Sequence, residues 1–321
     1  MADAKVDDQN TGQTGAGAGG GRPGSLPRFA QQGQTGTNRF GGGQQAPRFT
    51  PAPRWAGRAD TNPEAEMEYN DRIRRFYAMH LAHEGESEIF RGTEFWNWGY
   101  WTQSTSSQNE ACENLLELLL SFIPEKSGRI LDVACGKGAT TRHLLRYFAP
   151  ENVTGINISP EQIAACKERL PEVNFQEMDA ADLEFGDGEI DNIICVEAMC
   201  HFNTRADFLR EALRVLKPGG YLVFSDSLLR AETEIQPRVN YLETALQYTD
   251  VGLEAGFDTV EVYDTTEETW NRFGQFHMRN AYQRVQSGEL TPRNLGLTGM
   301  WLRRTAPVAY VVGWMQKSAN S

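Results

Sequence analysis

Two glycines one residue apart, Gly136 and Gly138, lie in the stretch "DVACGKGATT", directly after an apolar run. A loop of this kind lets the backbone approach a bound ligand closely. It does not match a nucleoside triphosphate loop, because Lys137 lies between the glycines and no Ser or Thr follows it. It matches a dinucleotide fingerprint poorly, because Thr141 stands where the third small residue is needed. Asp132 adds a carboxylate that repels a pyrophosphate and suits an ammonium group.

A second acceptor group follows further along the chain. Asp179, in "FQEMDAADLEF", is suited to the exocyclic amine of an adenine. A crevice lined by acceptors, next to a loop that allows close approach, fits an adenosine joined to a cationic amino acid. The sequence therefore predicts S-adenosylmethionine as the cofactor.

The chemistry expected with this cofactor is methyl transfer from a sulfonium, in which the protein mainly aligns the acceptor and excludes water. An amine acceptor needs only its lone pair, whereas a hydroxyl acceptor also needs a base. His201, in "VEAMCHF" after an expected strand, is the predicted catalytic base, with a structural hydrogen bond as its alternative role. No metal site is expected, because the five cysteines are scattered and lack the spacing of zinc ligands.

These residues must be held by a regular alternation of strands and helices. Strands are predicted at 129–134, 153–158, 173–176, 190–196, 220–226, 258–264 and 308–315. Helical segments are predicted at 139–148, 160–169, 205–216, 241–255 and 267–286. This alternation predicts an α/β fold with a doubly wound, mostly parallel, seven-stranded, Rossmann-like sheet, in which ligands bind beyond the carboxyl ends of the strands.

Five motifs occur in order at suitable spacings: "ILDVACGKGATT", "VTGINISPEQIAACKERL", "FQEMDAADLEF", "DNIICVEAMCHF" and "EALRVLKPGGYLVFSD". Together they resemble the class I S-adenosylmethionine-dependent methyltransferases over roughly residues 112–264. The upstream "NWGYW" resembles the small-molecule branch, which methylates sugars, macrolides, other natural products and phosphoethanolamine.

The resemblance also implies roles for individual residues. It implies that the methionine end of the cofactor is contacted by Ala134, Gly136 and Gly138, and the ribose and one face of the adenine by Asn157, Ile158 and Gln162. The edge of the adenine would be contacted by Asp179 and Ala180, and Tyr100 and Trp101 would close over the cofactor. Glu197 would begin the strand end that faces the methyl group, with both a cofactor-binding and a catalytic role. Trp96 is expected to pack in the core instead. Asn157 departs from the family, because many relatives carry an acid there.

Composition divides the 321-residue chain into two parts. Residues 1–58 are rich in Gly, Gln, Pro and Arg and are predicted to be a disordered tail. Residues 59–321 are predicted to form the methyltransferase domain. Within it we expect an N-terminal lid, a cofactor-binding core, and an insertion that shapes the acceptor site and precedes the last strand; their ranges are 59–111, 112–264 and 265–321.

Charge follows the same division, because the net charge of −12 combines a tail of +4 with a remainder of −16. We expect no nucleic-acid partner for so acidic a domain. We also expect no membrane insertion and a cytoplasmic location, since the chain shows no long apolar run and no signal peptide.

The predicted function is methylation of a small molecule, at the oxygen of a natural-product or sugar hydroxyl, as in secondary metabolism. Methylation at nitrogen or carbon is the alternative. A different class of function is a non-catalytic nucleoside-binding scaffold whose tail docks a partner through its repeated Arg–aromatic pairs. A homo-oligomer is left open by the sequence.

Overall fold

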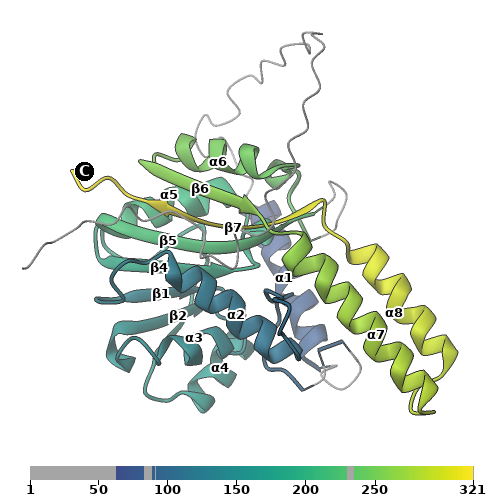
Figure 1. The fold of residues 1–321 in the computed structure, drawn as a ribbon. Helices are drawn as coiled ribbons and strands as arrows, with labels where there is room; N and C mark the ends of the chain where they lie inside the picture. The colour runs from purple at the N-terminus through teal and green to yellow at the C-terminus, as the bar shows by residue number, and fades with distance from the viewer. Residues whose placement is uncertain (1–62, 83–88, 91, 230–234, 321) are drawn as a thin grey trace, which may run out of the picture.

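The computed structural model of the chain describes residues 63–82, 89–90, 92–229 and 235–320. The tail predicted at 1–58 lies outside the described residues. A single seven-stranded sheet forms the centre of the fold (Figure 1), with the strand order β3-β2-β1-β4-β5-β7-β6. The strands are β1 (Ile130–Val133), β2 (Val153–Asn157), β3 (Asn174–Glu177), β4 (Ile190–Val196), β5 (Leu216–Leu228), β6 (Thr259–Asp264) and β7 (Ala309–Gln316).

The sheet is mostly parallel, as predicted. Strands β1 to β5 pair in parallel, and only β7 runs antiparallel to its neighbours β5 and β6. Central strand β1 is buried along its whole length, which agrees with its continuous apolar sequence. The direction in which successive strands are added reverses at β1, because β2 lies on one side of it and β4 on the other. A crevice therefore forms at the carboxyl ends of these strands.

Helices cover both faces of the sheet. They are α1 (Pro63–Ala82), α2 (Gln108–Ser121), α3 (Ala139–Leu144), α4 (Pro160–Arg169), α5 (Arg205–Val215), α6 (Ala245–Glu254), α7 (Arg272–Gln286) and α8 (Pro292–Thr305). One core cluster joins α2, α3 and α4 to the sheet, and a second joins α5 and α6 to the opposite face. Side-chain caps define several helix starts; Thr204 and Asp207, for example, form a capping box at α5.

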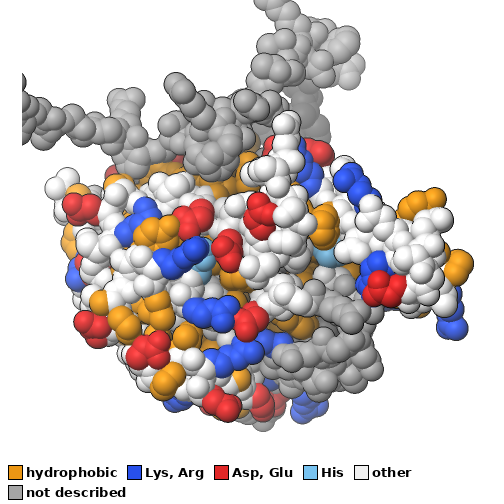
Figure 2. Space-filling view, turned by 60° about the horizontal axis from the view of Figure 1, so that its bottom comes forward, with side chains coloured by type: hydrophobic (Ala, Val, Ile, Leu, Met, Phe, Trp, Pro, Cys, Tyr) orange, Lys and Arg blue, Asp and Glu red, His pale blue; other side chains and the backbone are white. Residues whose placement is uncertain are grey.

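The long connection before β7 is more regular than predicted. Helix was expected only up to residue 286, but Pro292–Thr305 also form a helix, with Pro292 in its first turn and a capping box from Thr291 to Asn294. Helices α7 and α8 make a hairpin that projects beside the body of the protein (Figure 1). Apolar side chains lie at the outer part of this hairpin in Figure 2, in agreement with the exposure of Tyr282, Leu297 and Met300.

None of the described helices combines the length and the apolar composition needed to span a bilayer. Within the same described part of the chain, no group of His, Cys, Asp and Glu side chains is arranged to hold a metal ion. On the face shown in Figure 2, Lys and Arg side chains are interspersed with Asp and Glu side chains over the described surface.

Candidate active site

A pocket lies at the carboxyl ends of β1, β2 and β4, where the strand order reverses. Ten of the predicted site residues line it: Asp132, Ala134, Gly136, Asn157, Ile158, Gln162, Asp179, Ala180, Glu197 and His201. They come from segments up to 69 positions apart in sequence, and the parallel sheet brings them together.

The end of β1 forms the floor of the pocket. Ala134 (φ +59°) and Gly136 (φ +56°) both adopt left-handed backbone angles, so the chain turns sharply as it leaves the strand. A Cβ atom at Gly136 would meet nothing within 4 Å, so this position faces open space. Gly138 (φ +81°) does not line the pocket, and a Cβ there would lie 3.2 Å from the sulfur of Cys166. Gly138 therefore allows the loop to pack closely on α4.

Asp132 is a buried carboxyl group that accepts one side-chain hydrogen bond within the described part of the chain. It is 1% exposed, and the hydroxyl of Thr141 donates to its Oδ2 at 2.6 Å. Burial raises the pKa of Asp132 to about 7, although the hydrogen bond from Thr141 acts in the opposite direction. A cationic group bound beside this carboxyl would favour its ionised form, so the site is suited to an ammonium ligand.

The ends of β2 and β3 supply polar groups on the other side of the pocket. The amide of Asn157 donates to Gln162 Oε1 at 2.8 Å and accepts from the N–H of Ser159 at 2.9 Å. These contacts fix the orientation of the Asn157 amide at the end of β2. Asp179 accepts from the N–H of Ala181 at 2.9 Å, which directs the carboxylate at the end of its strand.

Helix α1 packs across the ends of the strands that carry the site residues. The amide of Asn70 donates to Asp179 Oδ2 at 2.8 Å, and Arg74 donates to the carbonyl of Ile158 at 2.9 Å. At the other side, the hydroxyl of Tyr69 lies 3.0 Å from the carbonyl oxygen of His201. The helix therefore connects the β2 and β3 ends to the loop that follows β4.

His201 ends a short 3-10 turn, Met199–His201, directly after β4. Its Nδ1 lies 2.7 Å from the carbonyl oxygen of Ile235. A carbonyl only accepts hydrogen bonds, so Nδ1 carries the proton and the neutral ring keeps a lone pair on Nε2. Burial lowers the pKa of His201, an effect that the Ile235 carbonyl opposes. The ring of Tyr77, on α1, contacts the His201 ring edge-on at 5.8 Å between centroids.

Glu197 lies at the end of β4 with a left-handed backbone (φ +52°). Its Oε1 accepts from the N–H of Trp98 at 2.8 Å and from the hydroxyl of Tyr310 at 2.6 Å. Burial raises the pKa of Glu197 to about 8, against the effect of these two hydrogen bonds. These contacts anchor the segment around Trp98 to the sheet. The catalytic role of Glu197 stays a prediction.

Comparisons with known proteins agree with this geometry. The sequence pattern of the family described as "Methyltransferase domain" matches residues 131–224. A phthiotriol/phenolphthiotriol dimycocerosates methyltransferase of Mycobacterium leprae is 31% identical over 188 residues, which cover 55% of this chain and 67% of that protein. Methyltransferase GfsG of Streptomyces halstedii is 31% identical over 205 residues, which cover 57% of this chain and 73% of that protein. The chain belongs to the class I S-adenosylmethionine-dependent methyltransferases.

Solved structures share the fold of this methyltransferase. The [4+2]-cyclase SpnF aligns with a TM-score of 0.59 at 21% identity, covering 78% of this chain and 97% of the cyclase. The geranyl diphosphate C-methyltransferase of Streptomyces coelicolor, solved with S-adenosyl-L-homocysteine, aligns with a TM-score of 0.57 at 16% identity. That alignment covers 78% of this chain and 97% of the C-methyltransferase. These identities are low, so the likeness concerns the fold alone.

Two residues predicted to close over the cofactor do not line the pocket of the methyltransferase. Tyr100 and Trp101 are only 2% and 3% exposed and pack in the core. Gly99 (φ +74°) passes so close to α2 that a Cβ there would lie 2.6 Å from the Cβ of Ala111. The N–H of Tyr100 then donates to the carbonyl of Ala111 at 2.7 Å, which turns this segment inward.

The wall of the pocket is formed by the residues just before that turn and by α1. It consists of Phe95, Trp96 and Asn97, together with Asn70, Ile73 and Tyr77. The expectation that Trp96 packs in the core was therefore wrong: Trp96 is half-buried and lines the pocket. The apolar spacing of α1 was a usable signal for this wall, but it did not show against which part of the sheet the helix packs.

The α7–α8 hairpin lies within the segment expected to shape the acceptor site, 265–321, and it reaches the site only indirectly. None of its described residues lines the pocket. The hairpin instead packs against Trp98, which directly follows the wall residues 95–97: the ring of Trp301 lies 5.9 Å from that of Trp98, and the ring of Phe273 lies 5.0 Å from it. The hairpin thereby supports the segment that forms the wall.

Proposed function

We propose that this methyltransferase transfers a methyl group to a hydroxyl oxygen of a small, largely apolar molecule, with His201 as the general base. The observation that carries the proposal is the state of His201. It lines the pocket, its Nδ1 donates to Ile235, and burial lowers its pKa, so a neutral ring with a free lone pair on Nε2 prevails at neutral pH.

The residues present fit the cofactor. Asp132 would bind its ammonium group, because among the described residues Thr141 is the one side chain that hydrogen-bonds to this buried carboxyl. Asp179 and Asn157 present oriented polar groups where the adenine and ribose would lie, and Gly136 leaves open space beside them. When bound, S-adenosylmethionine supplies a methyl group that is already activated by the positive sulfur.

The protein must accept the hydroxyl proton, position the reacting groups and exclude water. His201 accepts the hydroxyl proton at Nε2, and the carbonyl of Ile235 stabilises the imidazolium that results. Glu197 holds the segment of Trp98 in place, which keeps the adjoining wall against the pocket. Helix α1 covers the pocket and excludes water through contacts on both sides.

The wall also supports an apolar acceptor. Apolar and aromatic side chains that line the pocket include those of Ile73, Tyr77, Phe95, Val196 and Phe202. The similar mycobacterial protein is named for a triol, a compound that offers hydroxyl groups. Together these observations favour a hydroxyl-bearing natural product over a small polar amine.

The test is a His201→Ala variant, with His143→Ala as the matched control. His143 is also buried, but it pairs with Glu117 and does not line the pocket. We expect His201→Ala to lower kcat by about 10²- to 10⁴-fold with cofactor affinity unchanged. In the wild type, kcat at saturating cofactor should rise through a pKa below 6.5, the ordinary value for histidine, and then stay constant.

Other outcomes separate the alternatives. An amine acceptor would leave the rate of His201→Ala nearly unchanged, because an amine attacks through its own lone pair. A purely structural histidine would lose activity only in proportion to the loss of folded protein, which is the result expected for His143→Ala. Either result refutes the proposed role of His201.

A further inference from the structure

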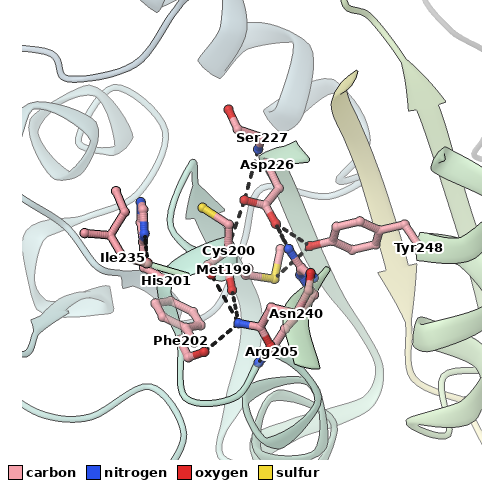
Figure 3. Close-up of polar contacts among 10 residues, drawn as sticks. All are labelled: Met199, Cys200, His201, Phe202, Arg205, Asp226, Ser227, Ile235, Asn240 and Tyr248. Atoms are coloured by element: carbon pink, nitrogen blue, oxygen red, sulfur yellow. Dashed lines mark hydrogen bonds and ion pairs between the residues drawn. The ribbon is translucent and has the colours of Figure 1, made fainter. Parts of the chain in front are cut away.

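A buried polar network lies behind the loop that carries His201 (Figure 3). Asp226, near the end of β5, is fully buried and pairs with Arg205, whose Nη2 lies 2.9 Å from its Oδ2. The hydroxyl of Tyr248 donates to the same oxygen at 3.1 Å, and the N–H of Cys200 donates to Oδ1 at 3.2 Å. Asp226 therefore ties the loop after β4 to β5, α5 and α6 at once.

Asn240 holds the same loop from another side. Its Nδ2 lies within hydrogen-bond distance of three loop carbonyl oxygens: those of Met199 (3.4 Å), Cys200 (3.2 Å) and Phe202 (2.6 Å). Its Oδ1 accepts from the backbone N–H of Arg205 at 2.9 Å, and its own carbonyl accepts from the Arg205 guanidinium at 2.5 Å. One buried amide thus connects the start of α5 with the whole turn that contains the histidine.

The segment between β5 and α6 contributes twice to this arrangement. It carries Asn240, which holds the turn, and Ile235, whose carbonyl fixes the tautomer of His201. Arg205, Asp226 and Asn240 do not line the pocket themselves. Asn240 carries no charge, so any effect that it has on chemistry must pass through the position of the loop; Asp226 and Arg205 also act on the pKa of His201, in opposite directions.

We propose that Asn240, together with the Arg205–Asp226 pair, is a positioning residue for His201. This inference rests on the proposed function. Holding the loop and the Ile235 carbonyl in one unit sets both the direction of the His201 ring and the nitrogen that carries its proton. A displacement of a reacting group by about 1 Å can cost about 10²-fold in rate, so losing this support should affect catalysis before it affects cofactor binding.

The experiment compares Asn240→Ala with Asn192→Ala. Asn192 is also a buried asparagine whose amide donates to a backbone carbonyl, that of Ser127 at 3.1 Å, but it lies at the opposite end of β4 and away from the pocket. We expect Asn240→Ala to lower kcat by about 10- to 100-fold and to leave the Kd for S-adenosylhomocysteine within about twofold. Asn192→Ala should also lower the melting temperature but keep kcat within about twofold.

A second measurement does not depend on activity. The ¹⁵N chemical shifts of His201, assigned with the His201→Ala variant, report which ring nitrogen carries the proton. We expect the Nδ1–H tautomer in the wild type and in Asn192→Ala, and a mixture of tautomers in Asn240→Ala.

The outcomes are distinguishable. An unchanged kcat and tautomer in Asn240→Ala overturn the positioning role. The role is also overturned if, in both Asn240→Ala and Asn192→Ala, kcat falls only in proportion to the loss of thermal stability. If the tautomer changes in Asn240→Ala while His201→Ala keeps the wild-type rate, the ring is positioned as inferred and it is the proposed base that fails.

Discussion

Cofactor affinity should depend on pH through Asp132, and the variant Asp132→Asn should remove that dependence. The ligand-free carboxyl titrates at about 7 because it is buried. Binding a cationic group favours the ionised form, so the pKa of Asp132 should fall on binding and a proton should be released. Affinity is expected to be low at acidic pH and to rise as the pH passes 7.

The magnitude follows from the pKa. At pH 6 only about a tenth of the Asp132 side chains are ionised, so affinity should be about tenfold lower than at pH 8. In Asp132→Asn, a charge-assisted contact worth about 1.5–3 kcal/mol is lost, which predicts about 10- to 150-fold weaker binding at pH 8. The difference between the two proteins should shrink at pH 6.

The assay is calorimetric titration with S-adenosylhomocysteine from pH 6 to 8.5, in buffers of different ionisation enthalpy. Comparing wild type with Asp132→Asn cancels the titration of the ligand itself. Proton release should appear in the wild type only. Equal pH slopes in the two proteins would refute the assignment of Asp132 to the ammonium group.

The same titration should appear in the stability of the ligand-free protein. The folded-state pKa of about 7 lies above the ordinary value of 3.8. The stabilising contribution of protonated Asp132 is therefore complete below about pH 4 and is lost as the pH rises through 7, by about 4 kcal/mol in total. In Asp132→Asn, thermal unfolding should show a flatter dependence on pH across this range.

Four further variants test other parts of the site. Gly136→Val should abolish calorimetric binding of the cofactor, because a branched side chain would be strained at φ +56° and would enter the open pocket; unchanged affinity would show that the pocket is assigned wrongly. Trp101→Phe should lower the free energy of unfolding by about 1–3 kcal/mol and leave cofactor affinity unchanged, since Trp101 packs in the core; a selective loss of affinity would restore its lid role. Glu197→Gln should reduce the fall in melting temperature between about pH 5 and pH 8, because the folded-state pKa of Glu197, about 8, lies above its ordinary value of 4.5 and stability is lost as the pH rises between the two; identical melting profiles would contradict this. Deleting residues 1–57 should leave turnover within about twofold, because the tail carries no catalytic pattern; a collapse of cofactor affinity would contradict it.

The sheet and the floor of the pocket could be predicted because both depend on local sequence. All seven strands were expected near their observed positions, since apolar runs alternate with helical periodicity. Once the strand order reverses at β1, the residues at strand ends must converge on one crevice. For this reason Asp132, Asn157, Asp179 and His201 lie together as predicted.

The covering wall could not be predicted in the same way, because it depends on contacts between distant segments. The sequence "FWNWGYW" contains aromatic residues on both sides of Gly99, and only packing on α2 decides which of them turn inward. The partners of α1 are likewise set by tertiary contacts, such as that of Asn70 with Asp179. Helix α8 was missed because its glycines weaken the helical signal, whereas the contact with α7 stabilises it.

Helix α1 has a consequence for the rate at which ligands enter and leave. It touches Asp179, on the expected adenine side, and through Tyr69 it touches the loop of His201. We expect cofactor and acceptor to exchange faster when these bonds open, so one opening event should control the residence time of both molecules. At about 1 kcal/mol net for each hydrogen bond, the closed helix should be favoured by a few kcal/mol, and removing a single bond should speed release several-fold. Stopped-flow dissociation of S-adenosylhomocysteine from Asn70→Ala and Tyr69→Phe would show this as faster release from both variants, although Tyr69 lies on the acceptor side.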